Sequence, residues 1–248
     1  MRPVNRGATP QINCINKTVT DYQNWRKDLI DRLGHYCSYC EMALHDSPQV
    51  EHVIAKTLDP TKEFEWENML LACGACNRNK SAKPWTETTH YFPDINNTLL
   101  VFTFLKTINP IYNENAVFIQ VSQNLTTVQI TKAQNTIEMC ELHTDSTALR
   151  SKQKVTDMRW KFRFDAIDSA EIWRASWGRC DIQKKTEFIT LLITVVKGGF
   201  WSVWFEIFKD ELLIRKALVE KFVGTANDCF DVDFNPIPRN PLNITDAI

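Results

Sequence analysis

The amino-acid sequence predicts an α+β fold, with a ββα unit near the N-terminus, a small β segment after it and a mainly α-helical C-terminal region. Two Cys-x-x-Cys pairs bracket two short apolar stretches, and β-branched residues gather in the segment that follows. From residue 132 onward, apolar residues recur at helical spacing. The turn-forming residues at 93–97 mark the predicted boundary between two domains, 1–92 and 93–248.

The N-terminal domain is predicted to begin with an extended arm over residues 1–19, followed by a helix. Thr20 and Gln23 have the spacing of a capping box, and Gly34 is expected to end this helix. After the first cysteine pair, we expect a strand, a loop, a second strand and a helix, at 49–55, 58–67, 69–72 and 77–83. This is the order of a ββα unit.

The C-terminal domain is predicted to start with β structure and to continue as helices. The expected strands are at 99–105, 116–121 and 127–131. The expected helices are at 133–142, 145–172, 184–196 and 200–223. The proline-containing segment 231–248 is expected to be extended.

Composition and charge restrict the class of protein. The net charge of −1 argues against a protein that coats nucleic acid by general attraction, although residues 148–185 carry ten Lys or Arg against five Asp or Glu. The basic residues considered on the helix expected there are Lys152, Lys154, Arg159, Lys161 and Arg163. They predict a surface for nucleic acid or a partner protein, or a solvated helix face.

The sequence favours a reducing compartment and no association with a membrane. The eight cysteines are not spaced like a disulfide framework. The N-terminus lacks the apolar run of a signal peptide, and no apolar stretch reaches the roughly 20 residues that span a bilayer. We therefore expect a cytoplasmic protein.

The two cysteine pairs predict a zinc site. Cys37 and Cys40 are separated by 32 residues from Cys73 and Cys76, and four thiolates at such a spacing close a tetrahedral zinc site, which is structural rather than catalytic. Two unrelated pairs of buried thiols and a redox motif are the alternatives. Neither is favoured, because both pairs lie just outside predicted strands and no thioredoxin-like pattern is present.

The segment between the cysteine pairs carries residues suited to phosphodiester hydrolysis. A neutral imidazole at His52 can take a proton from water near pH 7, and Glu51 and Asn77 offer the oxygen ligands that Mg²⁺ prefers. Asn68 is expected to hold the loop that orients His52. Contacts to phosphate are expected from basic residues of the following helix, with solvated side chains as the alternative: Lys80, Arg78 and Lys83.

Taken together, these residues resemble the HNH endonucleases with a zinc-stapled ββα-metal fold, over roughly residues 34–84. The resemblance implies a general base at His52, metal ligands at Glu51 and Asn77 for Mg²⁺ or Mn²⁺, and a loop-fixing amide at Asn68. Two positions depart from the commonest pattern. Glu51 stands where many members have Asp, and Asn77 stands where many have His.

A wider resemblance covers the N-terminus, with Tyr22-x-x-Trp25, the stretch from Gly34 to Glu41, and Ala133-x-x-x-Thr136-Ile137. This pattern is similar to the PtuB family of HNH effectors in Septu anti-phage systems and their retron-associated relatives. It implies a bacterial defence nuclease with an ABC/SMC-like ATPase partner (PtuA-type), and possible partnership with a retron reverse transcriptase and its RNA–DNA product. DNA is the favoured substrate, with RNA as the second candidate.

Two other functions compete with a nuclease. A non-catalytic zinc module that binds nucleic acid or protein explains the cysteines, but it leaves Glu51, His52, Asn68 and Asn77 as coincidence. A zinc nucleobase deaminase is disfavoured, because that chemistry needs His-x-Glu and an open zinc position.

Overall fold

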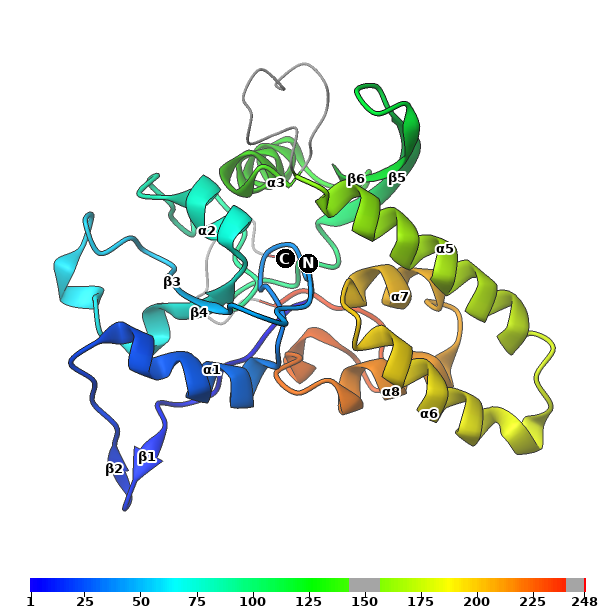
Figure 1. The fold of residues 1–248 in the computed structure, drawn as a ribbon, viewed down its shortest axis with the longest axis horizontal. Coiled ribbons are helices and arrows are strands. Elements are labelled where there is room, and N and C mark those ends of the chain that lie inside the picture. Colours follow the sequence, from blue (N-terminus) through cyan, green and yellow to red (C-terminus); the bar gives the residue numbers. More distant parts are fainter. Residues whose placement is uncertain (143–156, 240–247) are drawn as a thin grey trace.

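The computed structural model describes residues 1–142, 157–239 and 248 of the chain. It is an α+β structure, as predicted, and its named strands form two-stranded antiparallel sheets that pair β1 with β2, β3 with β4 and β5 with β6. The ββα unit lies at one side of the molecule and the C-terminal helices at the other, with both chain ends near the centre (Figure 1). No helix in the described ranges is long and apolar enough to cross a bilayer.

The ββα unit consists of β3 (Gln49–His52), β4 (Met69–Ala72) and α2 (Gly74–Lys80). Strands β3 and β4 pair antiparallel, with His52 opposite Met69. Strand β3 ends at residue 52 rather than 55, because the Asn68 side chain bonds to the backbone of Ile54. Helix α2 begins three residues before the predicted position, since the Cys73 sulfur accepts a hydrogen bond from the Cys76 amide at its first turn.

Helix α1 (Arg26–Leu33) covers the ββα unit and follows a 3₁₀ turn at Tyr22–Trp25. The predicted capping box at Thr20 is wrong, because Asp21 supplies the cap by accepting a hydrogen bond from the Gln23 amide. The predicted stop at Gly34 is confirmed: its φ of 77° lies in the left-handed region.

The β segment that follows has two strands, β5 (Phe102–Asn109) and β6 (Glu114–Val121). The third predicted strand is wrong, because residues 127–131 belong to helix α3 (Thr127–Cys140). Its N-terminus carries a complete capping box, in which Thr126 and Gln129 bond to each other's backbone amides. These local bonds favour a helix over the strand that the β-branched residues indicate.

The C-terminal region contains α5 (Arg159–Trp177), α6 (Lys185–Val196), α7 (Trp201–Ile207) and α8 (Leu212–Lys221). The prediction of a helix at 184–196 is confirmed to within a residue. The predicted helix at 200–223 is divided in two at Phe208. Part of the expected helix at 145–172 and of the extended end at 231–248 lies outside the described residues.

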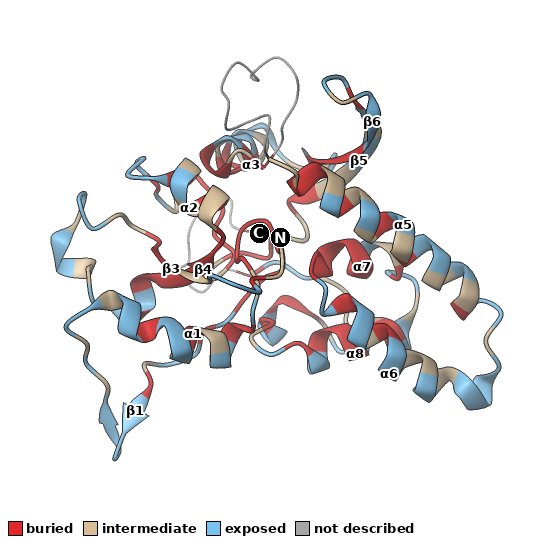
Figure 2. Cartoon of the chain, in the orientation of Figure 1, coloured by how far each residue is buried: buried red, intermediate tan, exposed pale blue. Residues whose placement is uncertain are grey.

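Two large groups of buried apolar side chains form most of the interior of the described residues, and a small third group consists of Ala116, Phe118 and Trp160. One spans residues between 1 and 142 and includes Ile248, and the other is centred on α5 to α8. Strands β3 and β4 and helix α7 are almost entirely buried, whereas much of α6 and the β1–β2 hairpin is exposed (Figure 2). The hairpin, Gln11–Ile12 paired with Ile15–Asn16, was not predicted.

The first six residues contain no helix, as expected of an extended arm, and five of the six are buried. They run between the two halves of the molecule. The Val4 amide donates to the Pro93 carbonyl at 2.7 Å, the Asn5 amide to the Gly224 carbonyl at 2.8 Å, and the Ala226 amide to the Pro3 carbonyl at 3.0 Å. This segment therefore joins the turn at residues 93–97 to the end of the helical region.

Replacing Gly224 with alanine is expected to destabilise the fold. Its φ of 77° costs an L-residue about 1–3 kcal/mol, and an added Cβ would lie 2.3 Å from the Arg32 carbonyl oxygen. Gly178 is the matched control, because its Cβ would meet only ordinary contacts, the nearest at 3.8 Å. Chemical denaturation of both variants checks this. Equal stability of the two alanine variants would contradict the close approach at Gly224.

Candidate functional site

The four cysteines of the paired motifs meet in one buried cluster, with all four sulfur atoms within 4.8 Å of one another. The Sγ atoms of Cys40 and Cys73 are 3.7 Å apart. A tetrahedron with zinc–sulfur bonds of about 2.3 Å has edges of about 3.8 Å, so this donor set fits a zinc ion. A site closed by four thiolates leaves no open position for substrate, and its role is structural.

His52 is the last residue of β3 and lies at the edge of the ββα unit, with 9% of its surface exposed. Its Nε2 atom is 3.0 Å from the carbonyl oxygen of Glu63. Because a carbonyl only accepts hydrogen bonds, Nε2 carries the proton and Nδ1 carries the lone pair. Burial lowers the pKa of His52 below its ordinary value, although the Glu63 carbonyl opposes the shift, so the imidazole is neutral at pH 7.

The ring of Tyr22 packs against His52, with the ring centroids 4.5 Å apart. Tyr22 belongs to the 3₁₀ turn before α1, and Glu63 belongs to the loop between β3 and β4. The imidazole is therefore fixed from two sides, by a ring contact and by a backbone carbonyl.

Asn68 is buried and fixes that loop. Its Oδ1 accepts from the Ile54 amide at 2.7 Å, and its Nδ2 donates to the carbonyls of Ile54 and Lys62, at 2.9 and 3.1 Å. Lys62 directly precedes Glu63, whose carbonyl holds His52. Asn68 thus acts on the imidazole through the loop rather than by touching it.

Glu51 lies beside His52 in sequence and forms a buried ion pair with Lys80 of α2, at 2.8 Å. Its other carboxylate oxygen accepts from the Tyr39 hydroxyl, and the Lys80 ammonium also donates to the His52 carbonyl at 2.7 Å. Lys80 is 0% exposed, so the expected contact between this lysine and a phosphate is wrong. It instead neutralises Glu51. Burial nevertheless raises the pKa of the Glu51 carboxyl above its ordinary value, although Lys80 opposes this shift.

Replacing Lys80 with methionine is expected to lower the free energy of unfolding by about 3–5 kcal/mol, because the Glu51 charge loses its buried partner. The double variant Glu51→Gln, Lys80→Met is expected to be more stable than the single one. Lys27→Met is the control, since its ion pair with Asp31 is exposed and screened by solvent. Urea unfolding measures all three. A Lys80→Met variant as stable as Lys27→Met would show that the ion pair does not hold the site.

Asn77 lies in the first part of α2, directly after the zinc-cluster residue Cys76. Its Nδ2 donates to the Oε1 atom of Gln49 on β3, at 2.8 Å. A carboxylate and an amide oxygen are ligand types that Mg²⁺ prefers. Both Glu51 oxygens, however, already accept from Lys80 and Tyr39. The arrangement therefore does not fit a metal ion at Glu51 unless the Lys80 ammonium moves.

The two other basic residues predicted to contact phosphate, Arg78 and Lys83, are exposed. The Lys83 ammonium donates to the Met139 carbonyl at 3.4 Å. Both side chains stay candidates for contact with nucleic acid.

Residues 37–83 match the family model of HNH endonucleases. The match contains both cysteine pairs, β3, β4 and α2, so the four-cysteine unit, called the HNH domain below, corresponds to this family model. No curated protein matches the chain, and no solved structure matches it.

Sequence reasoning missed several residues that shape the HNH domain. Gln49 lies two positions before Glu51, and the alternation of a strand places both on the face that meets α2. Tyr39 lies inside the first cysteine pair and reaches Glu51. The alternation of side chains along a strand could have indicated that Gln49 shares a face with Glu51. No sequence signal identifies the contact made by Tyr39.

The predicted basic surface of the C-terminal region requires correction. Arg159 and Arg163 are buried, and Lys161 pairs with Asp165 on its own helix. Lys152 and Lys154 lie outside the described residues. Arg159 instead reaches the HNH domain, where its Nη1 atom is 3.1 Å from the Cys76 sulfur.

Proposed function

We propose that this chain is an endonuclease that hydrolyses phosphodiester bonds, with DNA favoured over RNA as the substrate. The observation that carries the proposal is the state of His52. A neutral imidazole with its lone pair on Nδ1 lies at the edge of an HNH endonuclease domain and is held by Glu63 and Tyr22. This is what a general base requires.

In this mechanism, His52 Nδ1 takes a proton from a water molecule whose oxygen attacks the phosphorus atom, while the P–O bond to the leaving sugar oxygen breaks and that oxygen takes a proton from solvent water. The Glu63 carbonyl holds Nε2–H, so the imidazole keeps its orientation while charge develops on it. Asn68 keeps the Glu63 loop in place through its bonds to Ile54 and Lys62. Arg78 and Lys83 offer positive charge for the phosphate backbone on the exposed surface.

The proposed cofactors are a structural zinc ion at the four cysteines and Mg²⁺ or Mn²⁺ as the catalytic metal. Glu51 and Asn77 are the proposed protein ligands of the catalytic metal. Binding through Glu51 requires that Lys80 give up its ion pair, so we expect the catalytic metal to bind weakly in the absence of nucleic acid.

The sequence resemblance to PtuB-type effectors supports a role in bacterial anti-phage defence. On this proposal the nuclease works in the cytoplasm with a PtuA-type ABC/SMC-like ATPase, and a retron reverse transcriptase with its RNA–DNA product is a further candidate partner. With a net charge of −1, the chain has little general attraction for nucleic acid. We therefore expect the ATPase to bring the substrate close, and the isolated chain to be weakly active or inactive.

The test is cleavage of labelled duplex DNA and of total RNA in Mg²⁺ or Mn²⁺. The chain is assayed alone and co-purified with an ATPase of this type encoded beside it. Cleavage by the complex supports the proposal, and the label that is cut identifies the substrate. Vigorous cleavage by the chain alone would refute dependence on the partner.

A non-catalytic zinc module that binds nucleic acid or protein is the alternative, and the Lys80–Glu51 ion pair favours it. An ammonium group neutralises the carboxylate where a nuclease is expected to place a metal ion. Such a module should bind nucleic acid or its partner equally well with and without Mg²⁺ and leave every label uncut.

A further inference from the structure

Helix α5 contacts the zinc cluster through Arg159, the first residue of the helix. Its Nη1 atom donates to the Cys76 Sγ at 3.1 Å and to the Cys140 carbonyl at 3.1 Å, and Nη2 donates to the Glu141 carbonyl at 2.6 Å. One guanidinium therefore links the start of α5 to two other segments. It bonds to α2 through the Cys76 sulfur and to the end of α3 through the carbonyls of Cys140 and Glu141.

The guanidinium is held rigidly in this position. Asp157 accepts from Nε of Arg159 with both carboxylate oxygens at 2.9 Å, and it also accepts from the Arg159 amide at 3.0 Å. Arg159 is 4% exposed. A buried cation with a fixed fork of donors is suited to a cluster of four thiolates, because zinc neutralises only two of their four charges.

The other cysteine pair is also held from the C-terminal region, through Glu41, the residue after Cys40. The Glu41 carbonyl accepts from the Phe200 amide at 2.9 Å, and its carboxylate accepts from the Ser202 amide and hydroxyl. A Cβ on Gly199 would lie 2.9 Å from the Glu41 carbonyl oxygen, so the two backbones approach as closely as glycine allows.

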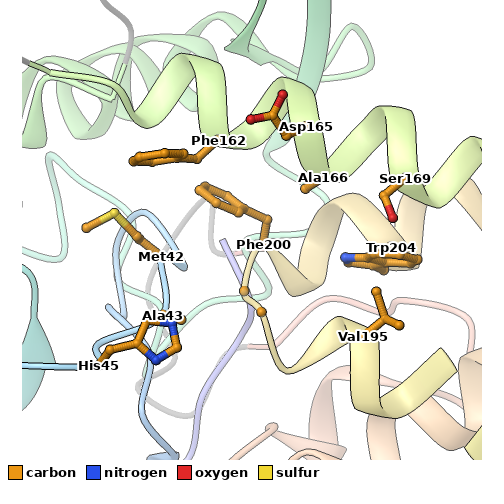
Figure 3. Close-up of a pocket in the computed structure, with 12 residues that line it drawn as sticks. Met42, Ala43, His45, Phe162, Asp165, Ala166, Ser169, Val195, Phe200 and Trp204 are labelled. Atoms are coloured by element: carbon orange, nitrogen blue, oxygen red, sulfur yellow. The ribbon is translucent and has the colours of Figure 1, made fainter. Parts of the chain in front are cut away.

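A cavity of about 400 Å³ lies beside the second contact, lined by Met42 and Ala43, which follow the first cysteine pair, and by Phe162 of α5 and Phe200 at the start of α7 (Figure 3). The helical region thus contacts a residue of the second cysteine pair, Cys76, and the residue that follows the first pair, Glu41. Of the two contacts, only Arg159 touches a sulfur atom.

We propose that Arg159 is a positioning residue of the zinc centre. Its N–H group donates to the Cys76 thiolate, offsets part of the excess negative charge, and fixes the start of α2. Because Asn77 follows Cys76 directly, the same bond sets where Asn77 meets β3. The proposal rests on the proposed function only for the role of Asn77, since the contact with the zinc centre is independent of catalysis.

Cobalt substitution tests the contact directly. A hydrogen bond withdraws electron density from a thiolate, so its loss makes the sulfur easier to oxidise. In the Co²⁺-loaded full chain, Arg159→Met is therefore expected to shift the sulfur-to-cobalt charge-transfer band to longer wavelength. Arg159→Lys keeps the positive charge and a hydrogen-bond donor, so its band is expected to lie between those of the wild type and Arg159→Met.

Arg163→Met is the matched control. Arg163 is buried on the same helix, one turn on, and its Nη1 donates to the Val117 carbonyl at 2.9 Å. Arg163 acts on Cys40 by charge and no hydrogen bond joins it to a cluster sulfur in the described residues, so this variant should shift the cobalt band less than Arg159→Met does. Competition with a chelator is expected to show about 10- to 100-fold weaker zinc binding for Arg159→Met. Asp157→Asn should weaken zinc binding in the same direction and to a smaller extent.

An unchanged spectrum and unchanged zinc affinity in Arg159→Met would overturn the proposal, as would an equal spectral shift in Arg163→Met. If Arg159→Met does not fold, the cobalt spectra of Arg159→Lys and Asp157→Asn test the proposal instead. A band at the wild-type wavelength in both variants would then overturn it. If neither the wild type nor any variant cleaves nucleic acid as the ATPase complex, the proposed nuclease function fails while the spectra still decide on Arg159.

Discussion

Cleavage by the His52→Ala variant is expected to fall about 100- to 10,000-fold, the usual contribution of a general base. The side chain carries the proton acceptor of the site, and alanine supplies none. Zinc content and thermal stability should change little, because His52 contacts Tyr22 and the Glu63 carbonyl but none of the zinc-cluster cysteines. The measurement is a rate of cleavage by the ATPase complex under single-turnover conditions.

His35→Ala is the matched control for this experiment, because His35 is exposed and lies just before the first cysteine pair. It should cleave at the wild-type rate. A His52→Ala variant that retains full cleavage, with its zinc bound, would remove His52 from the reaction and with it the proposed mechanism.

Loss of the zinc ion is expected to unfold the HNH domain. The four cysteines belong to the same buried cluster as all of β4, Val50 of β3, and Leu29 and Leu33 of α1, and structural zinc sites supply about 10–16 kcal/mol of binding free energy in small domains. Cys73→Ser should therefore abolish the folded domain, and a strong chelator should do the same to the wild type. Circular dichroism and tryptophan fluorescence report this, since Trp25 and Trp66 are buried in that cluster.

Cys14→Ser is the control, because Cys14 is exposed at the tip of the β1–β2 hairpin. It should unfold like the wild type and bind the same amount of zinc. If Cys73→Ser kept the wild-type unfolding transition, the cluster would be a set of buried thiols rather than a metal centre.

The ββα unit could be predicted because its signals are local. The cysteine pairs are separated by two residues each, and the stretches between them are short and apolar, so their order alone indicates the unit. The first part of helix α3, residues 127–131, is predicted as a strand for a local reason as well, whereas the helix predicted from residue 133 is confirmed. β-branched residues at 127–131 favour a strand, but the capping box at Thr126 and Gln129 decides the outcome.

The electrostatics of the site could not be predicted, because charged residues are placed on the surface by default. Lys80 is buried because Glu51, on a strand formed 29 residues earlier, supplies its counter-charge. Arg159 is buried because Cys76 and Cys140 meet it from other parts of the chain. Such pairs depend on how the elements pack, and no local pattern encodes them.

The bonds that residues 3–5 make with residues 224–226 also have a consequence for synthesis of the protein. The two segments are separated by about 220 residues, which a ribosome adds in roughly 10–40 seconds at about 5–20 residues per second. The segment at residues 3–5 therefore waits for residues 224–226 before it is seated. A polypeptide whose translation stops before residue 224 lacks these bonds, so full assembly of this fold requires that both segments have been synthesised.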